Sequence, residues 1–138
     1  HWRRFFSIRD GYGLHRLKER GYLLGVITGT KAQDIQERVR HLKVDYFFEG
    51  HLEKMSCLSE ISERTGLTFE QMAYMGDDVF DVPLLQKVGF SATVPDAMEE
   101  AIAAANYITK RPAGNGAVRE VCELLIHHGA LTISGERQ

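Results

Sequence analysis

A run of carboxylates stands directly after a short apolar segment in the second half of the sequence. Gly76-Asp77-Asp78 follows Met72-Ala73-Tyr74-Met75, and Asp81 comes shortly after. Negative charges this close repel one another unless a cation joins them, and an all-oxygen set of ligands is typical of Mg²⁺. Gly and Asp are also common in turns, and Asp81 could cap a helix before Pro83. The motif alone therefore predicts either a magnesium site or a turn.

Two further segments offer groups that bind phosphate. Thr28-Gly29 ends an apolar run and supplies a hydroxyl and close backbone N–H groups before a predicted helix. Lys54 opens another predicted helix, where its positive charge opposes the helix dipole unless an anion compensates it. Each segment has a simpler interpretation, because Thr-Gly also occurs in tight connections and most lysines are solvated at the surface. Only the combination of the segments favours a phosphate site.

These groups need a scaffold that brings strand ends together. Short apolar runs predict parallel strands covered on both faces, and apolar residues spaced three and four apart predict helices between them. The expected strands are 23–28, 44–48, 72–75, 90–93 and 107–109, and the expected helices are 32–42, 53–64, 79–88, 97–104 and 117–127. Their alternation predicts a doubly wound α/β sheet in one domain, with ligands beyond the carboxyl ends of the strands.

Composition narrows the class of partner. The 138 residues carry a formal net charge of −2 with acidic and basic residues interspersed, so we expect a small-molecule substrate and no nucleic acid. The apolar stretches are too short for a membrane helix and no signal peptide opens the sequence, which predicts a cytoplasmic protein without membrane contact. Cys57 and Cys122 lie far apart and are expected to be reduced thiols in the core.

The order of these motifs resembles that of the haloacid-dehalogenase superfamily, in which a hydroxyl, a lysine and an acidic loop follow successive strands. Within it, the sequence is similar over nearly its whole length to phosphatases of 3-deoxy-D-manno-octulosonate 8-phosphate. The similarity is carried by Arg9-Asp10-Gly11-Tyr12-Gly13, Val26-Ile27-Thr28-Gly29, residues 73–78 and Gly114-x-Gly116-Ala117-Val118-Arg119-Glu120-Val121. The resemblance implies a haloacid-dehalogenase-like Rossmannoid sheet without a large cap, a role in lipopolysaccharide precursor synthesis, and a homotetramer whose active sites are closed by neighbouring subunits.

The resemblance also implies roles for individual residues. Thr28 and Lys54 would hold the transferring phosphoryl group, Asp77 would bind Mg²⁺, and Asp78 and Asp81 would support the metal loop. The residues expected to contact the phosphorylated sugar acid are Ser7, Ile8, Arg9, Asp10, Gly11, His15, Gly29, Thr30, Arg38 and Lys54. The implied reaction is attack of an aspartate on phosphorus, followed by hydrolysis of the aspartyl-phosphate.

Two departures from the family pattern bear on function. Thr30 stands where the octulosonate phosphatases usually carry arginine and relatives acting on nine-carbon sugar acids carry glutamate, so a sialic-acid-type 9-phosphate is the alternative substrate. The family's Asp-x-Asp-Gly motif is absent from the 138 residues, and Asp10 cannot replace it because no aspartate follows two positions later.

The second departure predicts a core that lacks its first strand and its nucleophile, and a chain that is inactive by itself. Without that central strand, two strand edges would be unpaired and a cleft would open in the core. If such a loss were natural, the remaining surface would serve only for binding or assembly, which is the alternative outside the enzyme class.

Overall fold

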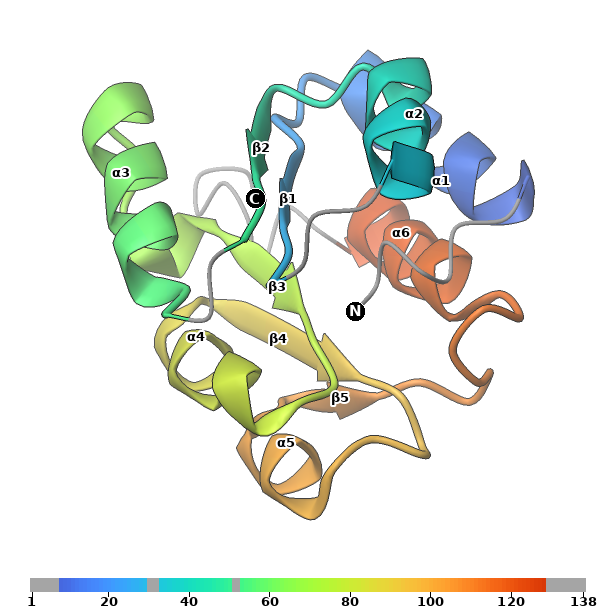
Figure 1. Ribbon diagram of the computed structural model, residues 1–138. Coiled ribbons are helices and arrows are strands. Elements are labelled where there is room, and N and C mark those ends of the chain that lie inside the picture. Colours follow the sequence, from blue (N-terminus) through green and yellow to red (C-terminus); the bar gives the residue numbers. More distant parts are fainter. Residues whose placement is uncertain (1–7, 30–32, 51–52, 129–138) are drawn as a thin grey trace.

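The computed structural model describes residues 8–29, 33–50 and 53–128, which form a mixed α/β structure (Figure 1). Its helices are α1 (Ile8–Glu19), α2 (Gln33–Leu42), α3 (Met55–Thr65), α4 (Val82–Lys87), α5 (Glu99–Ala104) and α6 (Ala117–His128). Its strands are β1 (Gly25–Ile27), β2 (Tyr46–Phe48), β3 (Ala73–Met75), β4 (Phe90–Thr93) and β5 (Tyr107–Ile108), and η2 (Phe69–Gln71) and η3 (Val79–Asp81) are short 3-10 helices. None of these described helices has the length and apolar character needed to cross a membrane.

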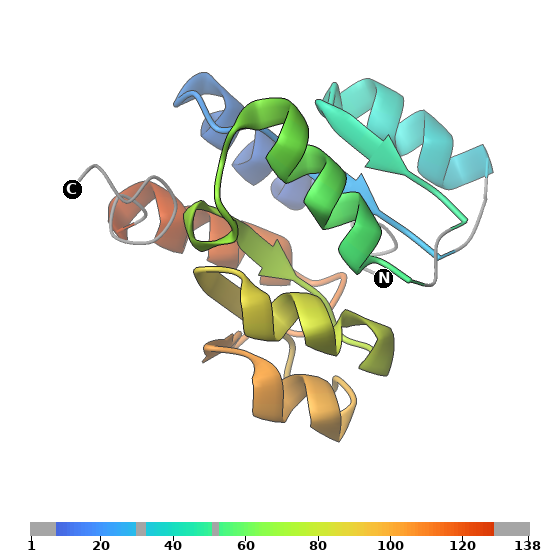
Figure 2. The ribbon, with the colours of Figure 1, turned by 90° about the vertical axis from the view of Figure 1, so that its left-hand side faces the viewer.

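The strand pairings in the described residues are all parallel and form two sheets. β1 pairs with β2, with Gly25 opposite Tyr46. The other sheet has the order β3-β4-β5, with Ala73 opposite Phe90. Figure 2 shows the arrows of β1, β2 and β3 pointing toward the same side, so the residues that follow these strands lie along one edge. The prediction of an α/β fold with parallel strands joined by helices is therefore confirmed.

A cleft of about 610 Å³ lies between β1 and β3. Residues of α3 line it as well as residues of α1 and α6, and many of its side chains are apolar, including Leu14, Ile27, Leu58, Met75 and Val118. In the part of the chain that the structure describes, β1 pairs only with β2 and β3 only with β4. The cleft is therefore a slot bounded by two strands, each with one strand partner.

Most element ends lie within two residues of the predicted ones, but two helices differ more. Helix α1 was not predicted, because Gly11 and Gly13 disfavour a helix. A Cβ at Gly13 would lie only 3.0 Å from the Cβ of Cys122, so the glycine allows α1 to pack closely against α6. The helix predicted over 79–88 begins as η3 and continues as α4, with Pro83 near its start, where the missing N–H removes no helical hydrogen bond.

Buried apolar side chains form two main clusters. The first contains Leu17 of α1 and Cys122 of α6, and the second contains Cys57 of α3 together with Leu84 and Leu85 of α4. Each fully buried leucine contributes about 1.5–3 kcal/mol relative to an exposed one. These clusters cover both faces of the strands and hold the strand ends in place. Cys57 and Cys122 are both buried, which confirms the prediction that their thiols lie in the core.

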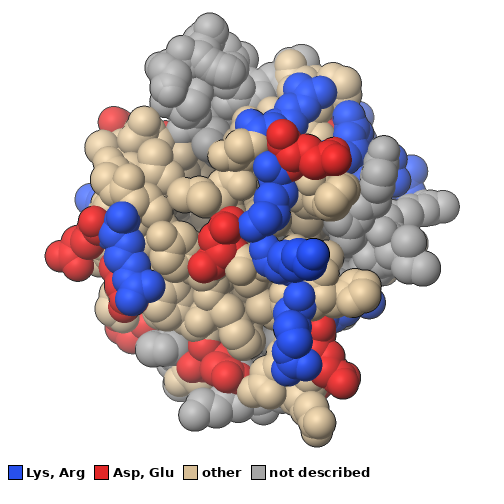
Figure 3. Space-filling model, turned by 90° about the horizontal axis from the view of Figure 1, so that it is seen from above, with Lys and Arg blue, Asp and Glu red and all other residues tan. Residues whose placement is uncertain are grey.

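Charged side chains are paired across the surface. Figure 3 shows a band of Lys and Arg side chains on one face, with Asp and Glu side chains beside it. Lys18 Nζ lies 2.9 Å from Asp45 Oδ1, and Arg16 pairs with Glu123. Asp45 also accepts the backbone N–H of Leu24 at 2.8 Å. Burial raises the pKa of Asp45, but the hydrogen bonds from Leu24 and Lys18 and the charge of Lys18 outweigh burial, so the pKa is lowered.

Candidate active site

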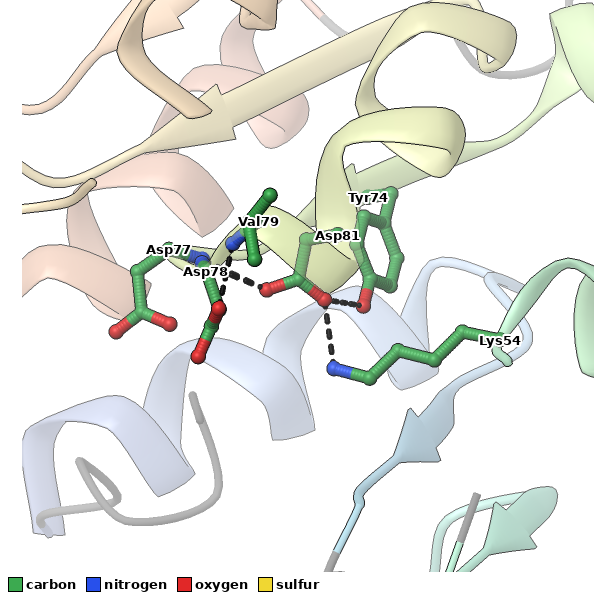
Figure 4. Close-up of polar contacts among 6 residues, drawn as sticks. All are labelled: Lys54, Tyr74, Asp77, Asp78, Val79 and Asp81. Atoms are coloured by element: carbon green, nitrogen blue, oxygen red, sulfur yellow. Dashed lines mark hydrogen bonds and ion pairs between the residues drawn. The ribbon is translucent and has the colours of Figure 1, made fainter. Parts of the chain in front are cut away.

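The carboxylate of Asp81 is the centre of a buried polar cluster (Figure 4). Its Oδ1 accepts hydrogen bonds from Lys54 Nζ at 2.7 Å and from the Tyr74 hydroxyl at 2.6 Å. Its Oδ2 accepts the backbone N–H of Asp77 at 2.9 Å and that of Asp78 at 3.0 Å. One carboxylate therefore joins the lysine to the acidic loop, two motifs that the sequence places at separate strand ends.

The cluster is almost completely shielded from solvent. Asp81 is 0% exposed, Lys54 is 1% exposed and Tyr74 is 8% exposed. A buried charge is tolerated only when it is paired and hydrogen-bonded, and here each charge is both. Burial, together with the negative charge of Asp81, raises the pKa of Tyr74 well above its usual value. Tyr74 therefore keeps its proton and remains a hydrogen-bond donor to Asp81.

Gly76 allows the carboxylate to reach the acidic loop. A Cβ at Gly76 would lie 2.4 Å from Asp81 Cγ and 2.6 Å from Asp81 Oδ2, closer than real Cβ contacts allow. The loop then continues into η3 through a capping box. The Asp78 carboxylate accepts the backbone N–H of Asp81, and the Asp81 carboxylate accepts the backbone N–H of Asp78. Glycine, cap and carboxylate together fix the path of the loop after β3.

Lys54 owes its position to the start of α3. The helix was predicted from Glu53, but it begins at Met55 with Lys54 as its N-cap residue. The carboxylate of Glu53 accepts the backbone N–H groups of Met55 and Ser56, each at 3.2 Å. Lys54 thus points into the core, where Asp81 supplies the anion that a lysine at a helix start requires. The interpretation of Lys54 as a solvated surface residue is therefore wrong.

Thr28 and Gly29 follow β1 directly. Thr28 is 0% exposed, and its backbone N–H donates to the carbonyl of Phe48 at 2.9 Å, which ties the end of β1 to the end of β2. Gly29 is half-buried. Thr28, Lys54 and Asp77 therefore come after β1, β2 and β3 respectively, as the sequence predicts.

The side chains of Asp77 and Asp78 are half-buried and belong to the same loop. Figure 4 shows the Asp77 carboxylate pointing away from Asp81 and Lys54. The backbone carbonyl of Asp77 accepts the N–H of Met98 at 3.0 Å, and the Asp78 carboxylate accepts the N–H of Val79. The loop is therefore held by hydrogen bonds of its backbone and of the Asp78 carboxylate.

The acidic loop offers few protein ligands, which suits a magnesium ion. The oxygens of Asp81 already accept the four hydrogen bonds described above, so Asp81 supports the loop instead of offering a ligand. Among the described residues, no group of three or more His, Cys, Asp or Glu side chains is placed to hold a metal. Mg²⁺ is commonly bound by one or two carboxylates, with waters and substrate phosphate completing the octahedron. Asp77, with Asp78 beside it in the chain, fits that pattern.

The residues predicted to contact a sugar acid are less well defined. His15 lies on the exposed side of α1, where its Nε2 is 3.4 Å from Glu19 Oε2, and Arg38 is half-buried on α2. Residues 8–11 belong to α1, but their side chains are outside the described set. Ser7 and Thr30 are also outside the described residues. Their contact with substrate stays a prediction.

Tyr74 belongs to the motif over residues 73–78, but the sequence indicates no role for it. Its hydroxyl is the second side-chain donor to Asp81 Oδ1. A signal was present, because a tyrosine inside a buried strand needs a partner for its hydroxyl, and the nearest acceptors in the chain are the carboxylates after Gly76. Strand geometry alone could not select Asp81 from among them.

Comparisons with known proteins agree with this arrangement. The profile of the haloacid dehalogenase-like hydrolases matches residues 46–121, which include Lys54 and the acidic loop. The 3-deoxy-D-manno-octulosonate 8-phosphate phosphatase of Escherichia coli (strain K12) is 38% identical over 121 residues, which are 88% of this chain and 64% of that protein. The chain therefore spans somewhat less than two thirds of the length of this curated relative.

Solved structures show the same similarity. The Moraxella catarrhalis 3-deoxy-D-manno-octulosonate 8-phosphate phosphatase, in complex with magnesium, phosphate and KDO, has a TM-score of 0.86 and 36% identity, covering 88% of this chain and 70% of that one. The cobalt-bound phosphatase of Haemophilus influenzae has a TM-score of 0.84 and 32% identity, covering 91% of this chain and 74% of that one. The chain belongs to the haloacid dehalogenase-like hydrolases, and within them to the family of the 3-deoxy-D-manno-octulosonate 8-phosphate phosphatases.

Proposed function

We propose that this chain is the core of a magnesium-dependent phosphatase that converts 3-deoxy-D-manno-octulosonate 8-phosphate to the free sugar acid and phosphate during lipopolysaccharide precursor synthesis. The observation that carries the proposal is the buried Lys54–Asp81 pair, hydrogen-bonded to the acidic loop. It supports the proposal because a lysine and an oxygen-rich loop are thereby held at one strand edge. By resemblance we also propose a cytoplasmic homotetramer.

The chain's own residues would act on the phosphoryl group by position and charge. Lys54, oriented by Asp81, would donate to the phosphoryl oxygens and offset their negative charge in the transition state. Thr28, buried at the end of β1, would contribute a hydroxyl to the same oxygens. Asp77 would hold Mg²⁺, supported by the Asp78–Asp81 turn, and the bound ion would supply further charge stabilisation.

The nucleophile would come from polypeptide outside the 138 residues. We propose that an apolar β-strand carrying Asp-x-Asp-Gly occupies the 610 Å³ cleft, parallel to β1 and β3, and ends at the edge where Thr28, Lys54 and Asp77 lie. The apolar walls support this choice of occupant. β1 and β3 support it as well, because each has one strand partner among the described residues and a strand between them would satisfy backbone groups on both sides. The relatives' additional third of length offers a source for such a strand.

The test compares two proteins for phosphate release from 3-deoxy-D-manno-octulosonate 8-phosphate in the presence of Mg²⁺. One is the 138-residue chain. The other is the same chain preceded by the N-terminal segment of the Moraxella catarrhalis enzyme. We expect turnover only from the longer protein, and none when its first motif aspartate is replaced by asparagine. Turnover by the 138 residues alone would show that their nucleophile is internal.

Within the active longer protein, Lys54→Ala should lower kcat by about 10²–10³-fold, because it removes an oriented donor to developing charge. The matched control is Lys87→Ala, which removes an exposed lysine at the end of α4. A rise in KM with unchanged kcat would instead assign Lys54 to substrate binding alone.

Thr30 favours one second candidate, a phosphatase for a nine-carbon sialic-acid-type 9-phosphate, because the octulosonate family usually has arginine at this position. Turnover of the two sugar phosphates by the longer protein, measured side by side, separates these candidates. A longer protein that folds, binds Mg²⁺ and turns over neither ester would favour the binding or assembly role.

A further inference from the structure

Tyr74 occupies the middle of β3 and is not assigned a role by any of the motifs. Its hydroxyl donates to Asp81 Oδ1, the same oxygen that accepts Lys54 Nζ. The side chain is buried, and its ring packs in the cluster that contains Cys57 of α3 and Leu84 of α4. The hydroxyl therefore reaches the active-site carboxylate from a fixed point in the core.

The carboxylate of Asp81 needs such a fixed point. Rotation about the bond that carries an aspartate carboxylate is soft, so its orientation is set by its hydrogen-bond partners. Lys54 is a compact charge on a flexible stem with three rotatable donors, and it attracts the carboxylate without selecting one orientation. Tyr74 has one hydroxyl donor on a rigid ring held by packing. It is the donor on Oδ1 that fixes how the two oxygens are turned.

That orientation is transmitted to both halves of the site. With Oδ1 fixed, Oδ2 faces the backbone N–H groups of Asp77 and Asp78 at 2.9 and 3.0 Å. The same rotation sets the direction in which Oδ1 meets Lys54 Nζ. We infer that Tyr74 is a positioning residue, which acts through Asp81 to align the metal loop and the phosphate-binding lysine. The inference rests on the proposed function for its meaning, but its geometry is independent of catalysis.

The test uses Tyr74→Phe in the 138-residue chain, with Tyr107→Phe as the matched control. The Tyr107 hydroxyl also donates to a carboxylate, that of Glu120, but between β5 and α6. Amide hydrogen exchange is measured by NMR for Asp77 and Asp78, with Asp45 as the reference. The Asp45 N–H donates to the carbonyl of Leu24 at 2.8 Å, outside the hydrogen bonds of both tyrosines.

Tyr74→Phe should speed exchange of the Asp77 and Asp78 amides by about tenfold relative to Asp45, because the loop loses its oriented acceptor. A merely structural role would speed all three amides equally. Tyr107→Phe should leave the ratio unchanged. The inference is overturned if the ratio is the same in Tyr74→Phe and in the parent chain.

Magnesium binding supplies the second readout, by calorimetric titration with MgCl₂ in the presence of inorganic phosphate. Changes to the partners that orient metal ligands commonly cost about 10–100-fold in affinity. Tyr74→Phe should raise the Kd for Mg²⁺ by about tenfold, at the lower end of that range. An unchanged Kd in Tyr74→Phe contradicts the inference. A parent chain that binds no Mg²⁺ counts against the proposed metal site, while the exchange ratio still decides the role of Tyr74.

Discussion

Asp81→Asn tests whether the buried ion pair holds the candidate site together. Lys54 and Asp81 have fully buried side chains, with Nζ 2.7 Å from Oδ1. Asparagine leaves the ammonium without a counter-charge and can place an NH₂ donor against it. Removing one partner of a buried pair costs about 3–5 kcal/mol, and we expect a loss of that size in the free energy of unfolding. The assay is urea denaturation of the 138-residue chain.

Lys54→Met in the same background removes the charge that Asp81→Asn leaves unpaired. The double variant should therefore recover much of the stability, giving a coupling energy of about 2–3 kcal/mol in a double-mutant cycle. If Asp81→Asn alone does not fold, cooperative unfolding of the double variant would equally show that the unpaired charge of Lys54 causes the loss of stability.

The matched control is the Lys18–Asp45 pair, which has a similar N–O distance of 2.9 Å but side chains that are 35% and 27% exposed. Pairs near the surface contribute about 0.2–1 kcal/mol. A coupling energy for Lys54 and Asp81 no larger than that of the control pair would refute the argument from burial.

Three further predictions address other parts of the chain. Gly76→Ala should cost about 1–3 kcal/mol by overpacking against Asp81, whereas Gly25→Ala, whose added Cβ would have its nearest neighbour at 3.6 Å, should be far milder in the same urea assay. The interactions that lower the pKa of Asp45 stabilise the fold at pH values above the ordinary pKa of 3.8, and this stability is lost as the pH falls through the folded-state pKa. Asp45→Asn should therefore flatten the decline in melting temperature on acidification. Parallel curves of melting temperature against pH for parent and variant would contradict this. Thr30→Arg in the longer protein should raise kcat/KM for octulosonate 8-phosphate relative to an ester without a carboxylate, by about tenfold per 1.4 kcal/mol gained, and equal changes for both esters would exclude carboxylate recognition.

Apolar runs and their spacing were sufficient to predict most of the fold. The strand over 90–93 has the predicted bounds, because it is short, follows Gly89 and is followed closely by the turn residues Pro95 and Asp96. Helix α1 was missed because Gly13 serves a contact with α6 that no local pattern reveals. The break between η3 and α4 depends on Asp81 turning inward to its partners, which is a tertiary effect.

The candidate site was predicted unevenly for the same reason. The sequence shows directly that Thr28, Lys54 and Asp77 follow successive strands, and parallel strands bring their ends to one edge. The sequence does not show that Lys54 and Tyr74 meet at one oxygen of Asp81, because this depends on which way each side chain points across the core. Lys54 shows the limit clearly, since a lysine at a helix start is usually solvated and here is 1% exposed.

The placement of the cysteines gives each half of the core its own chemical reporter. Cys57 belongs to the cluster around α3 and α4, and Cys122 to the cluster around α1 and α6. Burial raises the pKa of the Cys57 thiol, and only an exposed thiolate reacts quickly with alkylating reagents. Alkylation therefore times the opening of the surrounding structure. Equal rates at the two thiols would mean that the halves open together, and faster modification of Cys57 would mean that the α3–α4 half opens while the α1–α6 half stays closed.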